Sequence, residues 1–243
     1  DHSSCGTSRS RTEVVGGRMD RLAMRETEIF RALELLSPCK FVLIGGYAVN
    51  AYTLPRFSVD CDLVARKAEA GRMENMLAAE GYVRAAAEKT PYPHFVRLER
   101  KLSEGMSASI DLLLDSVHDR QSGASFPFDW LFSRSAIRRL SGKTVVESVR
   151  VRIIDPDALF VMKFVCARPS DIRDAFMLSD RIGDLAAVKE EISSKTDFGK
   201  RHDAIFGKVA GREFKKNLEG VFGYVEGAAF EKRLKILQKL GRA

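Results

Sequence analysis

The sequence predicts an α/β (α+β) fold in which a sheet-containing N-terminal domain, residues 19–154, precedes a helical C-terminal domain, residues 155–243. Up to residue 154, short apolar runs typical of strands alternate with segments of helical periodicity. From Asp184 onward, apolar residues recur only at helical spacing, and the helical stretches are divided by Gly199, Gly207, Gly211 and Gly220. Residues 1–18 are rich in serine, glycine and arginine and lack periodicity, so we expect them to form a flexible leader.

The composition is that of a globular protein with a basic surface. The chain has 243 residues, of which 45% are hydrophobic and 30% are charged, enough to bury a core. The net charge of +7 suits a polyanionic partner such as RNA, although net charge bears on nonspecific binding and not on fold. The four cysteines have no metal-type spacing and predict reduced thiols in a cytoplasmic protein. No apolar run approaches the ~20 residues of a membrane span, so we expect no membrane partner.

The first elements are a helix, a strand and a second, short helix. Apolar residues recur at helical spacing from about Asp20, and Pro38 ends this pattern. Residues 41–44 predict a buried strand, which Gly45 and Gly46 join to the short helix.

A second strand, after a turn, carries Asp60 and Asp62. Successive side chains on a strand point to opposite faces, so the two carboxylates share one face while Val59, Cys61 and Leu63 face the core. Two acidic groups side by side repel each other unless a cation lies between them. Hard oxygen ligands of this kind suit Mg²⁺, with Mn²⁺ as the alternative, and Mg²⁺ takes its remaining ligands from water and substrate phosphates.

The glycine pair predicts the other half of a nucleotide site. Glycine lets backbone amides approach a ligand closely, and the start of a helix offers unpaired N–H groups to phosphate. A phosphate cradle at Gly45 and Gly46 would therefore face metal ligands at Asp60 and Asp62. The Gly-Lys-Ser/Thr sequence of a P-loop does not follow the glycines, which argues against a P-loop kinase or ATPase.

Together these residues resemble the DNA polymerase β-like nucleotidyltransferase superfamily, whose signature is a strand, a Gly-Gly or Gly-Ser pair and, after a spacer, Asp-x-Asp on a strand. With Ala48 after the glycines and Arg-Phe-Ser-Val-Asp-Cys-Asp at residues 56–62, the pattern is most similar to the AbiEii/DUF1814 branch of toxin-type nucleotidyltransferases. That branch also has a downstream lysine and an Arg-x-x-x-Asp-x-x-Asp-like run, which Lys163 and residues 168–174 match, although members often have Arg-Asp where this chain has Ser-Asp. The resemblance covers residues 41–178 and implies a mixed-sheet nucleotidyltransferase core.

A third acidic residue interrupts a buried-strand pattern over residues 108–114. A carboxylate in an apolar strand is costly unless it is paired or bound to a metal. The resemblance implies a third acid on a neighbouring strand that helps to bind the catalytic metal and takes the proton of an attacking hydroxyl, and we assign this role to Asp111. Asp115 is the competing candidate, but its position suits the end of the strand or a cap of the next loop.

The remaining patterns of the first domain predict further strands and helices. They predict a helix over residues 68–80, strands over 82–86 and 94–100, and paired strands over 144–146 and 150–154. Residues 115–130 form a polar loop that becomes aromatic. Its rings either stack on a nucleotide base as a lid or, as we favour, fasten the loop to the core.

A helix start is predicted at Asp155, as N-cap, followed by proline at the first helical position. This helix carries Lys163, which the resemblance assigns to the triphosphate or to an acceptor phosphate, whereas composition alone favours a surface lysine. Arg168, Asp171 and Asp174 are expected to form an ion-pair network that fixes two helices.

The resemblance implies an enzyme, a nucleotidyltransferase of the EC 2.7.7 type that transfers NMP from an NTP to a hydroxyl acceptor. Asp111 joins the two acids of the second strand as metal ligands and catalytic residues. The expected nucleotide-binding residues are Gly45, Gly46, Arg56, Ser58 and Lys163. Ser58 equally suits a second role, as a cap of the turn before the second strand.

The same resemblance implies a toxin of a toxin–antitoxin pair that modifies RNA, such as tRNA, with an antitoxin protein as partner. Two other classes stay open. One is a nucleotidyltransferase that acts on small antibiotic-type molecules and needs no basic acceptor surface. The other is a non-catalytic nucleotide-binding module, against which the presence of all three acidic residues argues.

Overall fold

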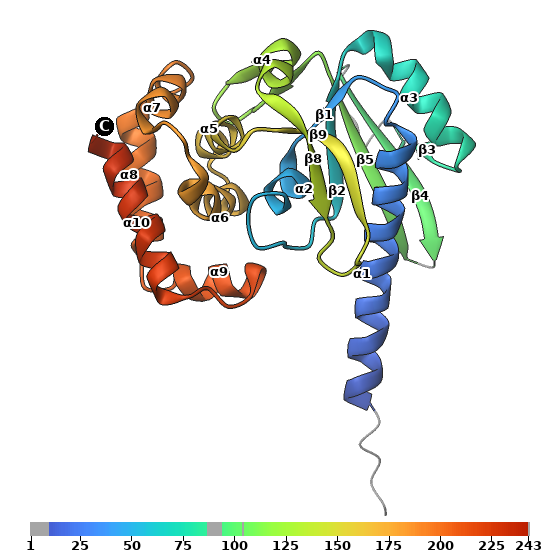
Figure 1. Cartoon of the computed structure of the whole chain (residues 1–243), viewed down its shortest axis with the longest axis horizontal. Helices are drawn as coiled ribbons and strands as arrows, with labels where there is room; N and C mark the ends of the chain where they lie inside the picture. Colours follow the sequence, from blue (N-terminus) through green and yellow to red (C-terminus); the bar gives the residue numbers. More distant parts are fainter. Residues whose placement is uncertain (1–9, 87–93, 104, 243) are drawn as a thin grey trace, which may run out of the picture.

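The computed structural model describes residues 10–86, 94–103 and 105–242, and its centre is a seven-stranded sheet with helices around it (Figure 1). The strand order is β3-β4-β5-β2-β1-β9-β8. The sheet is mixed because β2 pairs with β5, and β1 with β9, in parallel, whereas the other neighbours are antiparallel. This arrangement confirms the predicted fold class. The strands are β1 Phe41–Leu43, β2 Asp60–Ala65, β3 Val83–Arg84, β4 Phe95–Ser103, β5 Met106–Leu114, β8 Ser135–Ser141 and β9 Ser148–Ile154, and a separate hairpin joins β6 Ser116–His118 to β7 Ser125–Pro127.

The helices lie in two groups relative to the sheet. α1 packs across β5 and β9 with α3 beside it, and the helices after β9 gather to one side of the sheet (Figure 1). Every element between Pro156 and Arg242 is helical. The helices are α1 Ser10–Leu35, α2 Gly45–Asn50, α3 Lys67–Ala79, α4 Phe128–Ser133, α5 Pro156–Cys166, α6 Pro169–Leu178, the 3-10 helix η2 Ser179–Arg181, α7 Leu185–Ser193, α8 Phe198–Val209, α9 Phe214–Phe222 and α10 Gly227–Arg242.

The start of α5 is the one that the sequence predicts. Oδ1 of Asp155 accepts a hydrogen bond from the backbone N–H of Ala158 at 2.7 Å, and a proline occupies the first turn. The helix ends at Cys166, its C-cap Ala167 has a φ of +52°, and α6 begins at Pro169. This sharp break brings the last turn of α5 close to the first turn of α6.

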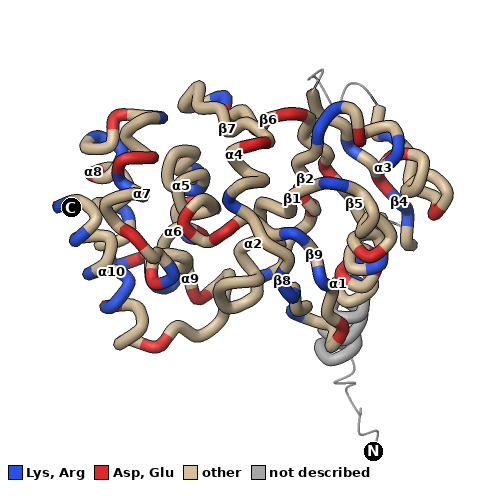
Figure 2. Tube along the Cα trace, turned by 45° about the horizontal axis from the view of Figure 1, so that its top comes forward, with Lys and Arg blue, Asp and Glu red and all other residues tan. Residues whose placement is uncertain are grey.

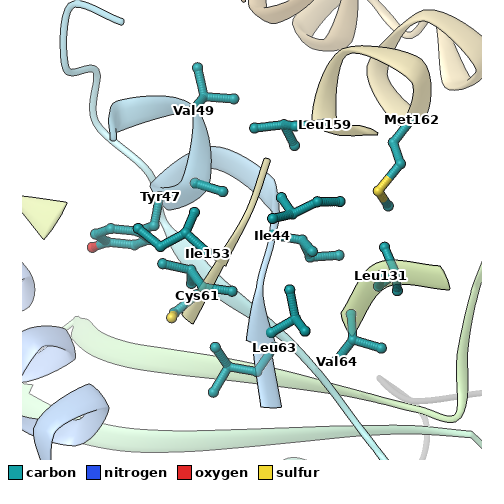
Figure 3. Close-up of a cluster of buried hydrophobic side chains, with 14 of the residues drawn as sticks. Ile44, Tyr47, Val49, Cys61, Leu63, Val64, Leu131, Ile153, Leu159 and Met162 are labelled. Carbon is teal, nitrogen blue, oxygen red and sulfur yellow. The ribbon is translucent and has the colours of Figure 1, made fainter. Parts of the chain in front are cut away.

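An apolar cluster supports β1, β2 and α5 (Figure 3). Ile44, Leu63, Ile153 and Leu159 come from four different parts of the chain and are almost completely buried. Burial of such side chains contributes about 1.5–3 kcal/mol each. The strand ends that carry the acidic residues therefore rest on rigid packing.

The predicted leader is wrong for residues 10–18, because α1 begins at Ser10. No proline interrupts the chain between Ser10 and Leu35, and adding residues to an existing helix is far cheaper than starting one. Residues 1–9 lie outside the described residues.

The predicted partner of β9 is also wrong. β9 pairs with β8 and not with residues 144–146. The backbone N–H groups of Lys143, Thr144 and Val145 donate instead to the Glu26 carboxylate of α1, at 2.8, 2.7 and 3.2 Å. A segment whose N–H groups bind a side chain has none left for a strand ladder.

Two smaller predictions differ from the structure. Val59 is 59% exposed and does not face the core, because β2 begins only at Asp60. The last helical stretch divides at Gly223, with φ +84°, and not at Gly220. No helix in the described part of the chain combines the length and apolar character needed to cross a membrane.

Candidate active site

Two neighbouring parallel strands bring the three predicted carboxylates to one face of the sheet. Asp62 on β2 lies directly opposite Asp111 on β5, and Asp60 lies opposite Ser109. Cys61, between the two acids of β2, is fully buried on the other face. We call Asp60, Asp62 and Asp111 the carboxylate triad.

Gly45 lies directly against the triad. The backbone N–H of Ile44 donates to the carbonyl oxygen of Asp62 at 3.0 Å, which joins the end of β1 to β2. Gly45 has a φ of +66°, and a Cβ atom there would stand 1.9 Å from Oδ2 of Asp62. Only glycine combines this backbone conformation with room for the carboxylate.

Gly46 lies against Ser58 and Arg56. A Cβ atom at Gly46 would stand 2.3 Å from Oγ of Ser58 and 3.0 Å from Nη2 of Arg56. The Ser58 hydroxyl donates to the carbonyl oxygen of Asp60 at 3.2 Å. This contact is the turn cap that the sequence offers as one of the two roles of Ser58.

Arg56 and Lys163 share a buried carboxylate. Nε and Nη2 of Arg56 each donate to Asp174 at 2.8 Å, and Asp174 is only 1% exposed. Nζ of Lys163 lies 2.8 Å from Oδ1 of Asp171 and 3.1 Å from Oδ2 of Asp174. These four residues, named here the Arg56–Lys163 network, join the loop before β2 to α5 and α6.

The Lys163 ammonium remains charged within this network. Burial lowers the pKa of Lys163, but the neighbouring Asp174 and Asp171 carboxylates raise it by more, so the pKa lies above its ordinary value. A positive charge is therefore fixed at the edge of the site.

A pocket of about 190 Å³ lies between Asp62 of the triad and the helices α5 and α6. Gly45, Asp62 and Lys163 line it, together with Asp119 of the β6–β7 hairpin. Nη2 of Arg168 binds Oδ1 of Asp119 at 2.6 Å. The Arg168 side chain therefore holds the hairpin and not the two helices. The ion-pair network predicted for α5 and α6 is formed instead by Asp171, Asp174 and Lys163.

The aromatic residues of segment 115–130 fasten that segment to the core. Phe126 and Phe128 are buried, and the rings of Phe126 and Trp130 pack at a centroid distance of 5.3 Å. Of the two interpretations of these rings, the structural one is observed.

Asp115 lies at the end of β5, where it has a φ of +64°. Its Oδ1 accepts a hydrogen bond from the backbone N–H of Lys67 at 3.0 Å, and so caps the start of α3. Asp111, and not Asp115, stands opposite Asp62.

Arg97 on β4 is a site residue that the sequence pattern does not reveal. Its Nε and Nη2 donate to Oδ1 and Oδ2 of Asp111 at 2.8 and 2.7 Å. Nη2 also lies 3.4 Å from Oδ1 of Asp60, which accepts a further hydrogen bond from the Ser109 hydroxyl at 2.7 Å. Two of the three triad carboxylates are therefore held by partners.

The Asp62 carboxylate has a different environment. Among the described residues, none donates a hydrogen bond to it. Burial raises the pKa of Asp62 to about 7, helped by the Asp111 charge and opposed by Lys163. Burial also raises the pKa of Asp111, but its bond to Arg97 counteracts this.

Two members of the triad, Asp60 and Asp62, suit a hard divalent cation. Asp62 supplies a carboxylate without a donor, and Asp60 lies on the same face of β2. Within the described residues, no three acidic, imidazole or thiolate groups converge as a complete ligand set. An ion at this place would draw its other ligands from water and substrate phosphates, which is the habit of Mg²⁺.

No family model matches the chain, and no curated protein matches it. A solution structure of the antibiotic-resistance factor ANT(2'')-Ia is similar, with a TM-score of 0.50 and 14% identity over 76% of this chain and 95% of that one. A crystal structure of an H. pylori protein described as a nucleotidyltransferase gives a TM-score of 0.49 and 13% identity over 96% of each chain. The lincosamide antibiotic adenylyltransferase LnuA, bound to lincomycin, gives a TM-score of 0.43 and 18% identity over 65% of this chain and 98% of that one. The likeness to ANT(2'')-Ia shows a shared fold.

Proposed function

We propose that this protein is a metal-dependent nucleotidyltransferase that moves NMP from an NTP to a hydroxyl group of an acceptor. The observation that carries this proposal is the carboxylate triad packed against Gly45, where Oδ2 of Asp62 occupies the space of a Cβ atom. The Asp62 carboxylate thus packs directly against the backbone of Gly45. This arrangement suits a cation held between protein carboxylates and phosphate oxygens.

The triphosphate would lie between the glycine pair and α5. Gly45 and Gly46 begin α2, whose first backbone N–H groups have no partner within the helix and can donate to phosphate oxygens. Lys163 lines the same pocket as Gly45 and has three N–H donors, of which Asp171 and Asp174 use two. The third N–H can meet a phosphate, while Arg56 and Ser58, beside Gly46, complete this side of the site.

The reaction is an in-line displacement at the α-phosphorus. The acceptor oxygen forms a new P–O bond, the bond to the bridging oxygen breaks, and pyrophosphate leaves. Asp111 takes the hydroxyl proton, a role helped by its raised pKa. Mg²⁺ or Mn²⁺ bound to Asp60 and Asp62 would stabilise the charge on the attacking and leaving oxygens.

An RNA acceptor is favoured by the charge of the chain and by the AbiEii/DUF1814-like motifs. Arginine residues are grouped along β8 and β9 (Figure 2), and the net charge is +7. Neutralising phosphates with such side chains gives salt-sensitive RNA binding. On this proposal the protein is a toxin that modifies RNA such as tRNA and is held by an antitoxin protein. The basic residues are Arg138, Arg139, Arg150 and Arg152.

A small-molecule acceptor is the alternative. It is favoured by the fold shared with ANT(2'')-Ia, an antibiotic-resistance factor. Such an enzyme would need no basic surface for its acceptor.

One experiment separates these functions. The protein is incubated with Mg²⁺ and each α-labelled NTP, together with either total tRNA or a panel of antibiotics, and an Asp60→Ala variant serves as the control. Label in RNA that decreases with added salt supports the RNA acceptor, and label in an antibiotic supports the alternative. NTP binding without transfer to either acceptor would contradict both and leave the non-catalytic module. Full activity of Asp60→Ala would refute the role of the triad.

A further inference from the structure

Arg97 is the cation that contacts the carboxylate triad directly. It comes from β4, on the side of β5 away from β2, and lies opposite Asp111 in the register. Its forked guanidinium binds both oxygens of Asp111 and reaches to 3.4 Å from Asp60. A bidentate contact of this kind fixes the plane of a carboxylate as well as its position.

The other cations near the site are engaged elsewhere. Arg56 and Lys163 bring two positive charges, and Asp171 and Asp174 bring two negative charges, so the Arg56–Lys163 network is balanced within itself. The triad has three carboxylates, and Arg97 is their one direct ion-pair partner among the described residues. Arg97 therefore has both a geometric and an electrostatic effect on the triad.

We propose that Arg97 is a positioning residue: it holds Asp111 in a fixed orientation and, by its charge, weakens the attraction of the triad for a divalent cation. The inference rests on the proposed function, because it takes the triad to be the metal site. The two effects are separable. Lysine keeps the charge but loses the fork, and methionine loses both.

The test measures Mn²⁺ binding by electron paramagnetic resonance, at pH 8 and without nucleotide. Arg97→Met should bind Mn²⁺ ~10-fold more tightly than the wild type, since a positive charge a few ångströms from the ion is lost. Arg97→Lys should bind Mn²⁺ within ~3-fold of the wild type, because its charge is retained. Unchanged or weaker binding by Arg97→Met would overturn the inference, as would a wild type that binds no Mn²⁺.

The rate of NMP transfer provides the second readout. Loss of the orientation of Asp111 should lower kcat ~100-fold in Arg97→Met and by a smaller factor in Arg97→Lys, while KM for the NTP changes little. A Lys variant with wild-type kcat would refute the orienting role. Because Mn²⁺ binding needs no turnover, a wild type that binds Mn²⁺ with the expected Arg97 dependence but transfers nothing would contradict the proposed function and not the effect of Arg97 on metal binding.

Arg100 provides a matched control. It lies on the same strand, its side chain is 27% exposed like that of Arg97, and its Nη1 binds Glu28 of α1 at 2.7 Å. Arg100→Met removes the same charge from the molecule at a place away from the triad. It should leave Mn²⁺ affinity and kcat unchanged, and an equal gain in Mn²⁺ affinity would show that net charge, and not position, is responsible.

Discussion

Asp62 carries the least satisfied charge of the triad. The other two carboxylates accept hydrogen bonds from Arg97 or Ser109, whereas no described residue donates one to Asp62. A partly buried carboxylate without a donor is costly in its ionised form, and its pKa of about 7 reflects this cost. A cation bound to Asp62 would remove this cost, so metal binding should stabilise the folded protein.

The Asp62→Asn variant tests this coupling through pH. The pKa of Asp62 rises from an ordinary 3.8 to about 7 on folding. The stability that the protonated group contributes is therefore fully present below pH 4 and is lost as the pH rises to 7. In EDTA, Asp62→Asn should exceed the wild type in stability by ~4 kcal/mol more at pH 8 than at pH 4. Calorimetry at the two pH values measures this, and a difference that does not change with pH would contradict it.

Gly45 is the position at which a single methyl group should abolish the reaction. Gly45→Ala places a non-glycine residue at φ +66° and a Cβ atom 1.9 Å from Oδ2 of Asp62. We expect a destabilisation of about 1–2 kcal/mol from the backbone conformation and loss of NMP transfer, because the carboxylate must move.

Gly71→Ala is the matched control. Gly71 lies within α3, and nothing stands within 4 Å of its added Cβ atom. This variant should be as active as the wild type and more stable by up to ~1 kcal/mol. Transfer by Gly45→Ala at the wild-type rate would contradict the account of the site.

The loop before β2 is held to the helical part of the chain by charge. Arg56 comes from that loop, Lys163 from α5, and Asp171 and Asp174 from α6. The sequence predicts an ion-pair network of Arg168 with the two acids of α6. In the structure both acids belong to a network, but their cations are Lys163 and Arg56, and not Arg168. A local pattern identifies the acids, but the cation that reaches them depends on the α5–α6 break and on a loop more than a hundred residues away.

Asp174→Asn tests the weight of this network. Asp174 is buried, and without its negative charge the positive charges of Arg56 and Lys163 are only partly neutralised. The variant should therefore lose about 3 kcal/mol of unfolding free energy. Asp129→Asn, which removes the partner of Arg66 in an exposed ion pair, should cost less than about 1 kcal/mol. Denaturant titration measures both, and equal effects would contradict the structural importance of the network.

At the scale of the whole molecule, the fold class follows from the sequence because the buried strands are strongly patterned. β1, β2 and β5 lie in the centre of the sheet, and their apolar runs are unmistakable. The edge strand β8 is missed because only one of its seven residues is buried. An edge strand needs no apolar alternation, and its arginines discourage further pairing.

The site was predictable where its residues are close in sequence. The glycine pair and the two acids of β2 belong to one stretch, and Asp111 is conspicuous as an acid in an apolar strand. Arg97 was not predictable, because its position depends on the register of β4 with β5. Counting back from the turn pair Ser103 and Met106 would place Leu98 opposite Asp111, but an irregularity near the turn shifts the register by one residue.

The most direct measurement of the central claim uses one NTP labelled either at the α- or at the γ-phosphate, with Mg²⁺ and the acceptor that responds. NMP transfer predicts that the α-label moves to the acceptor while the γ-label leaves as pyrophosphate. With the Asp60→Ala variant, neither label should leave the NTP. Transfer of the γ-label to the acceptor, or release of the γ-label as free phosphate with no α-label on any acceptor, would contradict the assignment of the carboxylate triad to nucleotidyl transfer.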